Sequence, residues 1–327
     1  MPLRSLRTVR ATHAIFAIAI ALAIAACSDS TGTGSGLPDD RLIAFVSDSG
    51  NCCGYSSIFV VHADGTHKTR VTSGDYHDDA PAWSPDGSTI AFYSSDRSPG
   101  GIWAVNADGS NLRSLVSSPG HYPADPAWSP NAHSIAFDEI ATDSLDNPTS
   151  IIMFADADGS HPHQLSTNAN DVASPSWSPD GTRIAFVAST SNPHVYVVRT
   201  DGTQEHQITN QLDFEPQWSP DGSRIAFATL DVNNEGILAQ ITVTSEDGSN
   251  RLALTSGDVS RHPAWSPDGR QIAYDEFTRD STTGQSLTPI RVFRMNADGS
   301  EKRPITSDGS QSPAHFRSWA PAWKPAP

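Results

Sequence analysis

Short segments in which the side chains alternate in character recur along most of the chain. In Ser88–Tyr93 (Ser-Thr-Ile-Ala-Phe-Tyr) and Thr182–Val187 (Thr-Arg-Ile-Ala-Phe-Val), isoleucine and phenylalanine fall on one face and alanine falls on the other. A period of two residues is typical of β-strands. Strands of the type Ile-Ala-Phe or Ile-Ala-Tyr begin at Ile43, Ile90, Ile135, Ile184, Ile225 and Ile272. Because no helical periodicity interrupts the chain after Arg41, the pattern predicts an all-β protein.

A second pattern precedes these strands. The phrase Pro-Ala-Trp-Ser-Pro-Asp-Gly at Pro81–Gly87 returns in closely similar form further along the chain, and a clipped copy stands at Pro321–Pro325. Ser-Pro-Asp-Gly suits a type I turn, because proline presets φ at the second position and glycine takes the last. The tryptophans of the phrase are Trp83, Trp128, Trp177, Trp218, Trp265 and Trp323. One strand-and-turn phrase per roughly 40 to 60 residues indicates a propeller or a solenoid.

The rest of each repeat also has the character of strands and turns. A second strand such as Gly101–Val105 leads to an Asp-Gly pair, which is a strong hairpin signal, and a short strand such as Gln207–Thr209 follows. Each repeat is therefore expected to hold four antiparallel strands, with the tryptophan on the first. In one repeat Asn131-Ala132 replaces Asp-Gly, and either residue could take the left-handed conformation of that turn. If Ala132 takes it, the backbone is strained by roughly 1 kcal/mol.

The phrase Pro-x-Trp-Ser-Pro-Asp-Gly-x-x-Ile-Ala-Phe with a later Asp-Gly resembles the WD40-like (PD40) repeat of the TolB-type β-propeller. The resemblance covers roughly residues 40 to 327 and implies a six-bladed propeller of four-stranded antiparallel blades. TolB carries an α/β domain before its propeller. We expect none here, because the strand Leu42–Val46 begins soon after the amino-terminal leader. The resemblance is specific for the fold and much less so for function, since many proteins reuse this blade.

The two ends of the chain are out of phase with the repeat. The chain enters the repeat at a second strand, Leu42–Val46, and its last element is a first strand, Pro321–Lys324. We expect the carboxyl-terminal strand to complete the blade built from Leu42–Thr72. Such a pairing closes the ring and covers an exposed strand edge.

Residues 1–26 have the pattern of a lipoprotein signal peptide. Three arginines precede a short apolar run, Ala14–Ala26, which is typical of secretory leaders. The run ends in Ile-Ala-Ala before Cys27 and resembles a bacterial lipobox, which implies cleavage before Cys27 and acylation of its thiol and amino group. Two or more acyl chains give stable anchoring. The alternative is ordinary secretion with an unmodified Cys27.

Residues 27–40 then form a lipidated linker, whose glycines and small polar residues predict flexibility, and residues 41–327 form the propeller. This division predicts a lipid-anchored protein of the bacterial cell envelope. If the cell has two membranes, Ser28 lacks the aspartate that usually retains lipoproteins inside. The expected place is then the outer membrane, facing the periplasm, or the cell surface.

The formal net charge is −16, and loss of the leader would remove three further positive charges. A strongly acidic chain does not favour nucleic acid or direct binding to anionic lipid headgroups. It favours solubility and a basic partner.

The adjacent Cys52 and Cys53 lie between glycines in a predicted loop. In an exported protein they could form a vicinal disulfide, remain two free thiols or bridge to another chain. We favour a structural vicinal disulfide. No Cys-x-x-Cys or histidine spacing accompanies them, so a metal site is not expected there.

The loops divide between two faces of the predicted propeller. The Ser-Pro-Asp-Gly and Asp-Gly turns repeat closely on one face, whereas longer and unlike loops lie on the other. Binding residues concentrate in loops on a rigid scaffold, so we expect function on the variable face and at the channel mouth that it surrounds. The connections that enter the first strands bring acidic and histidine residues there: His77, Asp78, Asp79, His121, Asp125, Asp171, Asp213, Glu215, Asp258 and His262.

Two interpretations of this rim stay open. Carboxylates and imidazoles could hold a Ca²⁺ ion or a transition metal. Because no ligand set of fixed spacing is visible, we favour a solvated acidic rim without a cofactor, in which Asp78, Asp79 and Asp125 face water. The sequence carries no Gly-x-Ser-x-Gly elbow, His-Glu-x-x-His motif, phosphate loop or Rossmann fingerprint.

These features favour a monomeric, non-catalytic propeller that binds an envelope or extracellular protein or peptide, preferentially a basic one. The alternative is a propeller enzyme or carbohydrate-binding protein with a metal-assisted site at the channel mouth. Clustered histidine and acidic ligands in that mouth would favour the alternative.

Overall fold

The computed structural model describes residues 41–48, 55–118, 121–142, 148–165, 167, 171–189, 192–233, 236–279, 287–306 and 318–326. The regular elements within these ranges are β-strands, as the alternating pattern predicts. No helix in the described part of the chain is long and apolar enough to cross a membrane.

The strands assemble four at a time in sequence order, and we number these strand groups 1 to 6. Group 1 holds β1 (Leu42–Ser47), β2 (Ser57–His62) and β3 (Thr69–Arg70), with β24 (Ser318–Trp323) beside β1. Group 2 holds β4 (Asp78–Trp83), β5 (Thr89–Ser94), β6 (Gly101–Asn106) and β7 (Arg113–Val116). Group 3 holds β8 (Tyr122–Trp128), β9 (Ser134–Thr142), β10 (Pro148–Asp156) and β11 (His163–Gln164).

Group 4 holds β12 (Val172–Trp177), β13 (Arg183–Ser189), β14 (Pro193–Arg199) and β15 (His206–Gln207). Group 5 holds β16 (Leu212–Trp218), β17 (Arg224–Asn233), β18 (Gly236–Ser245) and β19 (Leu252–Ala253). Group 6 holds β20 (Val259–Trp265), β21 (Gln271–Phe277), β22 (Arg291–Asn296) and β23 (Arg303–Pro304). Groups 5 and 6 form one sheet through a single parallel contact between Ala239 and Val259.

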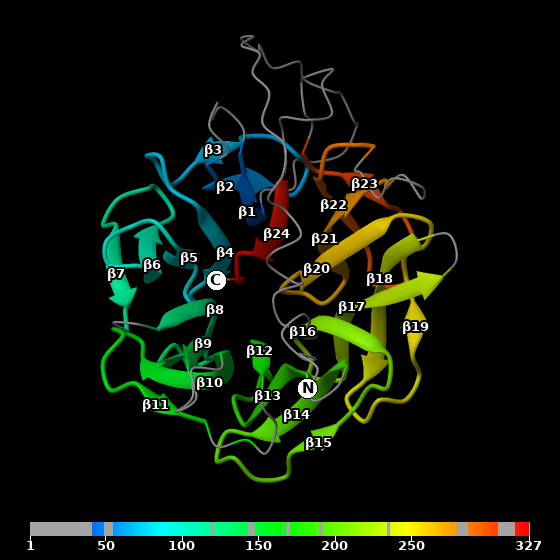
Figure 1. Cartoon of the computed structure of the whole chain (residues 1–327). Helices are drawn as coiled ribbons and strands as arrows, with labels where there is room; N and C mark the ends of the chain where they lie inside the picture. The colour runs from blue at the N-terminus through cyan, green and yellow to red at the C-terminus, as the bar shows by residue number, and fades with distance from the viewer. Residues whose placement is uncertain are drawn as a thin grey trace, which may run out of the picture.

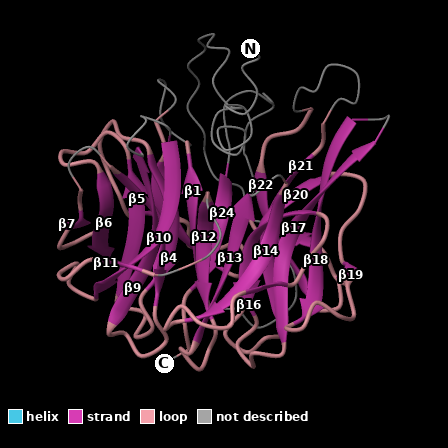
Figure 2. Ribbon diagram, turned by 60° about the horizontal axis from the view of Figure 1, so that its bottom comes forward, coloured by secondary structure: helices cyan, strands magenta, loops and turns pink. Residues whose placement is uncertain are grey.

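The groups stand around a common centre (Figure 1). The first strand of each repeat lies nearest to this centre and is called the inner strand below. Pairing within every group is antiparallel, for example between β9 and β10. Seen from the side, the strands run between two faces, and the carboxyl terminus lies at the lower one (Figure 2). The Ser-Pro-Asp-Gly turns follow the first strands and therefore lie on this lower face, the turn face. The upper face carries the longer loops and is called the loop face below.

Hydrophobic cores lie between neighbouring groups. The alternation in the Ile-Ala-Phe strands has the predicted effect, because Ile43 and Phe45 enter one core while Ala44 enters another. All three are fully buried. Groups 6 and 1, which come from opposite ends of the chain, also share a core, in which Val292 packs with Phe45 and Trp323.

The repeated tryptophan joins neighbouring groups through its indole N–H. Trp128 Nε1 donates to the carbonyl of Ala82 at 3.3 Å, and Trp83 Nε1 donates to that of Ala322 at 3.2 Å. Trp177 and Trp265 make the same bond to Ala127 and Gln217. In these four cases the acceptor is the residue before the tryptophan of the preceding inner strand, so that one bond joins each of these strands to the one before it. Trp218 Nε1 and Trp323 Nε1 are buried without a hydrogen-bond partner among the described residues.

The carboxyl-terminal strand meets the amino-terminal one directly. β24 pairs antiparallel with β1, with Ile43 opposite Trp323 and Ala44 opposite Ala322. Lys324 N donates to the carbonyl of Leu42 at 2.8 Å. This is the pairing that the out-of-phase repeats require.

In the irregular turn, Ala132 rather than Asn131 has the left-handed backbone. Its φ is +59°, whereas glycine occupies this position in the equivalent turns, with a φ of +69° at Gly181. Asn131 retains the role of the usual aspartate, since its Oδ1 accepts from Ser129 Oγ at 2.7 Å and from His133 N at 3.0 Å. The one departure from the repeated turn therefore has a backbone cost, because an alanine carries a Cβ in the left-handed region.

Replacement of Ala132 by glycine should stabilise the protein by about 1 kcal/mol, because it relieves that strain. The matched reverse change is Gly181→Ala, which should destabilise by a similar amount, since a Cβ there meets only Pro130 at 3.8 Å. Thermal and denaturant unfolding of both variants measure the effect. If Gly181→Ala lowers the free energy of unfolding but Ala132→Gly does not raise it, the backbone of Ala132 is not strained.

Deletion of residues 321–327 should lower the free energy of unfolding strongly. It removes Trp323 from the core shared by groups 1 and 6 and leaves the β1 edge exposed. Loss of a buried large aromatic side chain costs about 3 to 5 kcal/mol. Deletion of residues 326–327 alone, which lie beyond β24, is the control and should have little effect. An unchanged melting temperature after the longer deletion would refute the structural role of β24.

Candidate functional site

Every described inner strand from β4 to β20 is interrupted at the same place. The residue directly before the repeated proline has a left-handed backbone, at Ala80, Asp125, Ser174, Glu215 and His262, with φ between +46° and +57°. The strand register shifts at each of these points. A bulge of this kind re-aims the side chain that it carries. We call these five residues the collar, because the inner strands bring them around the common centre (Figure 1).

Collar residues of neighbouring groups bind one another. Ser174 Oγ donates to Asp125 Oδ2 at 3.0 Å, which joins groups 3 and 4. The backbone N–H of His262 donates to Glu215 Oε2 at 2.7 Å, which joins groups 5 and 6. Three of the residues predicted from sequence, Asp125, Glu215 and His262, are therefore collar residues, and two of them, Glu215 and His262, contact each other. Ala80 and Ser174 escaped prediction, although each stands in the same place before Pro-x-Trp.

His262 is held between two carboxylates. Its Nδ1 lies 2.5 Å from Asp275 Oδ1, and its Nε2 lies 3.1 Å from Glu215 Oε1. Burial lowers the pKa of this imidazole, but the charges of Glu215 and Asp275 outweigh that effect and raise its pKa to about 9. His262 is therefore an imidazolium at neutral pH. Both ring nitrogens then donate hydrogen bonds, so neither has a lone pair for a metal.

Asp125 faces a second carboxylate rather than a cation. Asp138 is 3% exposed, and its Oδ1 has no hydrogen-bond partner among the described residues. Burial, together with the charge of Asp125, raises the pKa of Asp138 well above its ordinary value. Asp138 was not predicted from sequence. A signal was present, because it follows Ile-Ala-Phe at a position where other repeats carry apolar residues such as Val46 and Val187.

Asp78 and Asp213 correct the expectation of a solvated rim. Asp78 is 1% exposed and forms a two-pronged ion pair with Arg97, with Nε to Oδ1 at 2.9 Å and Nη2 to Oδ2 at 2.7 Å. Asp213 is fully buried and binds Arg251 in the same manner, at 2.7 and 3.1 Å. The prediction that Asp78 faces water was wrong. An arginine distant in sequence neutralises each carboxylate, which makes these pairs structural.

The remaining rim residues lie at the loop face with partners of their own. His77 Nδ1 makes a short contact with Asp96, and half of its side chain is exposed. His121 Nδ1 lies 2.7 Å from Glu139 Oε1. Asp79 Oδ1 accepts from the backbone N–H of Ala80 at 2.7 Å. These residues do not converge: within the described ranges, no group of three or more His, Cys, Asp or Glu is arranged to hold a metal ion.

Two other rim aspartates were predicted. Burial raises the pKa of Asp171. Burial also raises the pKa of Glu276, and the charge of Asp258 raises it further. The three cysteines, Cys27, Cys52 and Cys53, lie outside the described residues. His161 and His163, by contrast, are exposed on the turn face.

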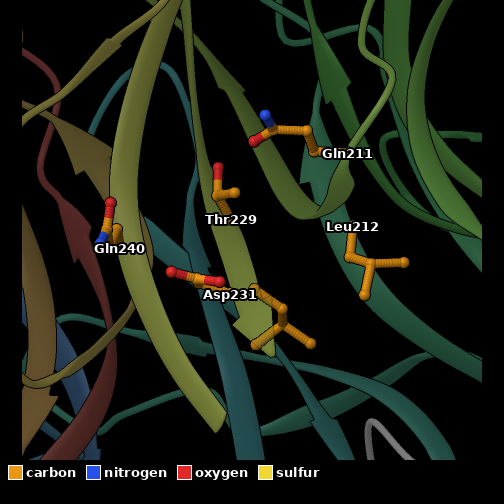
Figure 3. Close-up of a pocket in the computed structure, with 6 residues that line it drawn as sticks. Gln211, Leu212, Thr229, Asp231 and Gln240 are labelled. Carbon is orange, nitrogen blue, oxygen red and sulfur yellow. The ribbon is translucent and has the colours of Figure 1, made fainter. Parts of the chain in front are cut away.

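A recess of about 390 Å³ lies at the loop-face end of group 5 (Figure 3). Its wall consists mainly of polar side chains from β16, β17 and β18 and the approach to β16: Gln211, Leu212, Thr229, Leu230, Asp231 and Gln240. Thr229 Oγ1 also donates to Asp213 Oδ1 at 2.8 Å, so the recess borders the buried Asp213–Arg251 pair. Its amides and carboxylate could bind a polar ligand, and nothing in the sequence pattern predicted it.

Comparison with known proteins agrees with this architecture. TolB from Acinetobacter baumannii superposes with a TM-score of 0.71 at 20% identity, over 88% of this chain and 68% of that chain. An oligogalacturonate lyase in complex with manganese superposes with a TM-score of 0.53 at 14% identity, over 80% of this chain and 76% of that chain. At such identities the likeness shows the fold alone.

Curated relatives match shorter stretches. An uncharacterized protein of Agrobacterium fabrum is 32% identical over 138 residues, which are 40% of this chain and 46% of that protein. The Tol-Pal system protein TolB of Thioalkalivibrio sulfidiphilus is 38% identical over 60 residues, which are 18% of this chain and 14% of that protein. The chain thus matches less than half the length of either relative.

The described sheets and their arrangement define an all-β, propeller-like protein. The family model of the TolB beta propeller domain matches residues 21–149 and 142–322. The chain belongs to this family, which confirms the resemblance found in the repeated phrase.

Asp78→Asn should destabilise the fold, because it leaves the buried guanidinium of Arg97 without its counter-charge. Breaking a buried pair by removing one partner costs about 3 to 5 kcal/mol. The double variant Asp78→Asn with Arg97→Met should recover part of this loss. Denaturant unfolding measures both, with the exposed Asp75→Asn as control. Equal stability of Asp78→Asn and Asp75→Asn would contradict a structural pair.

His262→Gln should destabilise the protein in a pH-dependent manner. Because folding raises the pKa of His262 from 6.5 to about 9, its contribution is fully present below about pH 6.5 and is lost as pH rises through 9. The difference in free energy of unfolding between parent and variant should therefore shrink between pH 6 and pH 10. The half-exposed His77→Gln is the control. A difference that grows with pH would overturn the assignment.

Proposed function

We propose that this protein is a non-catalytic scaffold that binds another protein or peptide at its loop face. The observation that carries the proposal is the collar. Five bulges stand at one position of five inner strands, and they pair Asp125 with Ser174 and Glu215 with His262. Around them lie unlike loops, whereas the turn face repeats one shape. A rigid frame with variable loops and a central set of polar groups suits recognition of a partner.

We also propose that the six strand groups are six blades of a closed ring. The pairing of β24 with β1 and the core shared by groups 6 and 1 support this. A closed ring would leave no long sheet edge open to unwanted pairing. It would also fix the loops around the collar in one geometry, which reduces the entropy cost of binding.

Lipid anchoring in the bacterial cell envelope is the next part of the proposal. It rests on the leader, on the lipobox-like residues before Cys27 and on relatives that are named Tol-Pal system proteins. The outer membrane is the place that Ser28 favours. Cys27→Ala should abolish acylation and leave the protein unprocessed or soluble. Mass spectrometry of the mature amino terminus tests this, and an unmodified terminus elsewhere in the chain would exclude it.

A basic partner fits the charge of the chain, which is −16 before removal of the leader. Acidic side chains speed encounter with a basic partner, and salt weakens the effect. Asp79 on the loop face and Asp125 in the collar are partly exposed and should contribute, whereas Asp78 should not, because Arg97 neutralises it.

Affinity capture with the mature domain, followed by association kinetics, tests the choice of face. The variant Asp79→Asn with Asp125→Asn should bind more slowly at low salt and approach the parent at high salt. The control is Glu246→Gln with Glu301→Gln, which removes the same charge from the turn face. Trimming residues 280–286 from the longest loop should reduce binding at any salt. If the control pair alone disrupts binding, the turn face is the interface.

A carbohydrate-binding or enzymatic function is the second candidate, and the recess beside β17 and β18 favours it. Gln211, Asp231 and Gln240 supply the amide and carboxylate groups that hydroxyl-rich ligands bind. A solved structure of similar fold is an oligogalacturonate lyase with manganese, so metal-assisted chemistry is a reasonable test. Turnover of oligogalacturonate with Mn²⁺ or Ca²⁺, lost in Gln240→Ala, would support this candidate over the first.

A further inference from the structure

Groups 3 and 6 place an aspartate at the same point beside the collar. Asp138 lies opposite Ala124, the residue before the collar residue Asp125. Asp275 lies opposite Arg261, the residue before the collar residue His262. The two sites are thus equivalent by register.

The next group contributes equivalently placed collar residues. In group 3, Asp125 accepts a bond from Ser174 of group 4. In group 5, Glu215 accepts one from His262 of group 6. In both places an acidic collar residue accepts from the next collar residue, through the hydroxyl of Ser174 in one case and the backbone N–H of His262 in the other.

The two sites differ in how their charges are balanced. In group 6 the collar residue is the cation: His262 lies between Asp275 and Glu215, and Arg261 Nη2 lies 3.7 Å from Asp275 Oδ2. Asp275 Oδ2 has no hydrogen-bond partner among the described residues, but two cations stand beside this carboxylate. In group 3 the collar residue is itself an acid. Asp138 Oδ1 is buried without a partner among the described residues, and its side chain shares a sheet face with Ala136, which packs against group 4. The position that His262 fills with a positive charge is thus filled with a negative one.

We propose that the Asp125–Asp138 pair binds a basic side chain of the partner polypeptide, an ammonium or guanidinium group that supplies the cation which His262 supplies in group 6. This inference rests on the proposed protein-binding function and names the chemistry of its ligand. Ser174 Oγ already donates to Asp125 Oδ2, so Asp125 Oδ1 and Asp138 Oδ1 are the oxygens that accept from the ligand.

The surroundings suit an organic cation. Burial raises the pKa of the Tyr93 hydroxyl, and the charges of Asp96, Asp79, Tyr122 and Asp125 raise it further. Tyr122 is 62% exposed at the start of β8. Aromatic rings attract cations and cover the methylene stem of a long basic side chain. A Ca²⁺ ion needs six to eight oxygen ligands, whereas the described residues here supply two carboxylates and a hydroxyl.

Binding involves a proton as well. Burial and the charge of Asp125 favour the neutral form of Asp138. Asp171, directly before β12 in group 4, is a further acid whose pKa burial raises. A cation placed between Asp125 and Asp138 reverses this preference. The Asp138 proton then passes to the buffer, and binding of the basic group strengthens as pH rises.

The test uses the full mature chain and a blocked tripeptide, acetyl-Gly-Lys-Gly-amide, with its arginine analogue. The neutral control ligand carries acetyl-lysine. Asp125→His builds into group 3 the arrangement of group 6, and His262 shows that histidine adopts this backbone, with a φ of +50°. We expect saturable binding of the basic peptides to the parent and roughly tenfold to hundredfold weaker binding to Asp125→His. Asp138→Asn should weaken binding comparably, and Asp75→Asn, with the same loss of charge, should not.

Calorimetry in buffers of different ionisation enthalpy, between pH 5 and pH 8, measures the protons released when the peptide binds. The parent should release a proton, and Asp138→Asn should not. Equal binding by parent and Asp125→His, equal binding of the acetyl-lysine peptide, or no saturable binding of either basic peptide would overturn the inference. Binding of Ca²⁺ that displaces the peptide and needs both aspartates would overturn it in favour of a metal site. Capture of a partner by the loop face is measured separately, so failure here does not decide the proposed function.

Discussion

The indole of the repeated tryptophan lies in the interface between two sheets, and in four of the six repeats its N–H bonds across that interface to the preceding inner strand. Trp128 bonds to the carbonyl of Ala82 in the preceding inner strand, and Trp83 bonds to that of Ala322 at the far end of the chain. A buried donor without an acceptor is costly, so the bond fixes the height of each strand against its neighbour. Register and core then follow at the same level in these repeats, whereas Trp218 and Trp323 lie in their cores without such a bond among the described residues.

A strained residue also recurs before the repeated proline in each inner strand from β4 to β20. A proline restricts the residue before it to extended conformations, yet Glu215 and His262 are left-handed. The strand must gain a residue at this point to keep the tryptophan in its interface, and the resulting bulge turns one side chain per repeat toward its neighbours. The fold thus fixes five collar positions without fixing their chemistry. Alanine, serine, glutamate, aspartate and histidine all occur there, which leaves these positions open to function.

The fold was largely predictable because the recurring motif gives the length of the repeat directly. Alternation in Ile-Ala-Phe, the turn Ser-Pro-Asp-Gly and the Asp-Gly hairpin agree in every copy, and local and global signals then support one another. The site was predictable only in part. Sequence placed Asp125, Glu215 and His262 near the centre, but it could not reveal that Arg97 reaches back 19 residues to neutralise Asp78. Long side chains form such pairs across a sheet, where no local pattern records them.

Because the chain is built from repeats, each collar position can be compared with the equivalent position in another repeat. Because the repeats share backbone geometry, a difference between two equivalent positions reports a difference in chemistry alone. His262 neutralises Asp275, whereas Asp125 adds charge beside Asp138 at the same register. The two sites cost different amounts to bury, since His262 pairs with the carboxylate of Asp275, whereas Asp138 has no cation beside it, favours its neutral form and leaves Oδ1 without a partner among the described residues. A fold stabilised by its tryptophan bonds and interlocked ends can carry one such unbalanced position, and that position is where an outside charge gains most by binding.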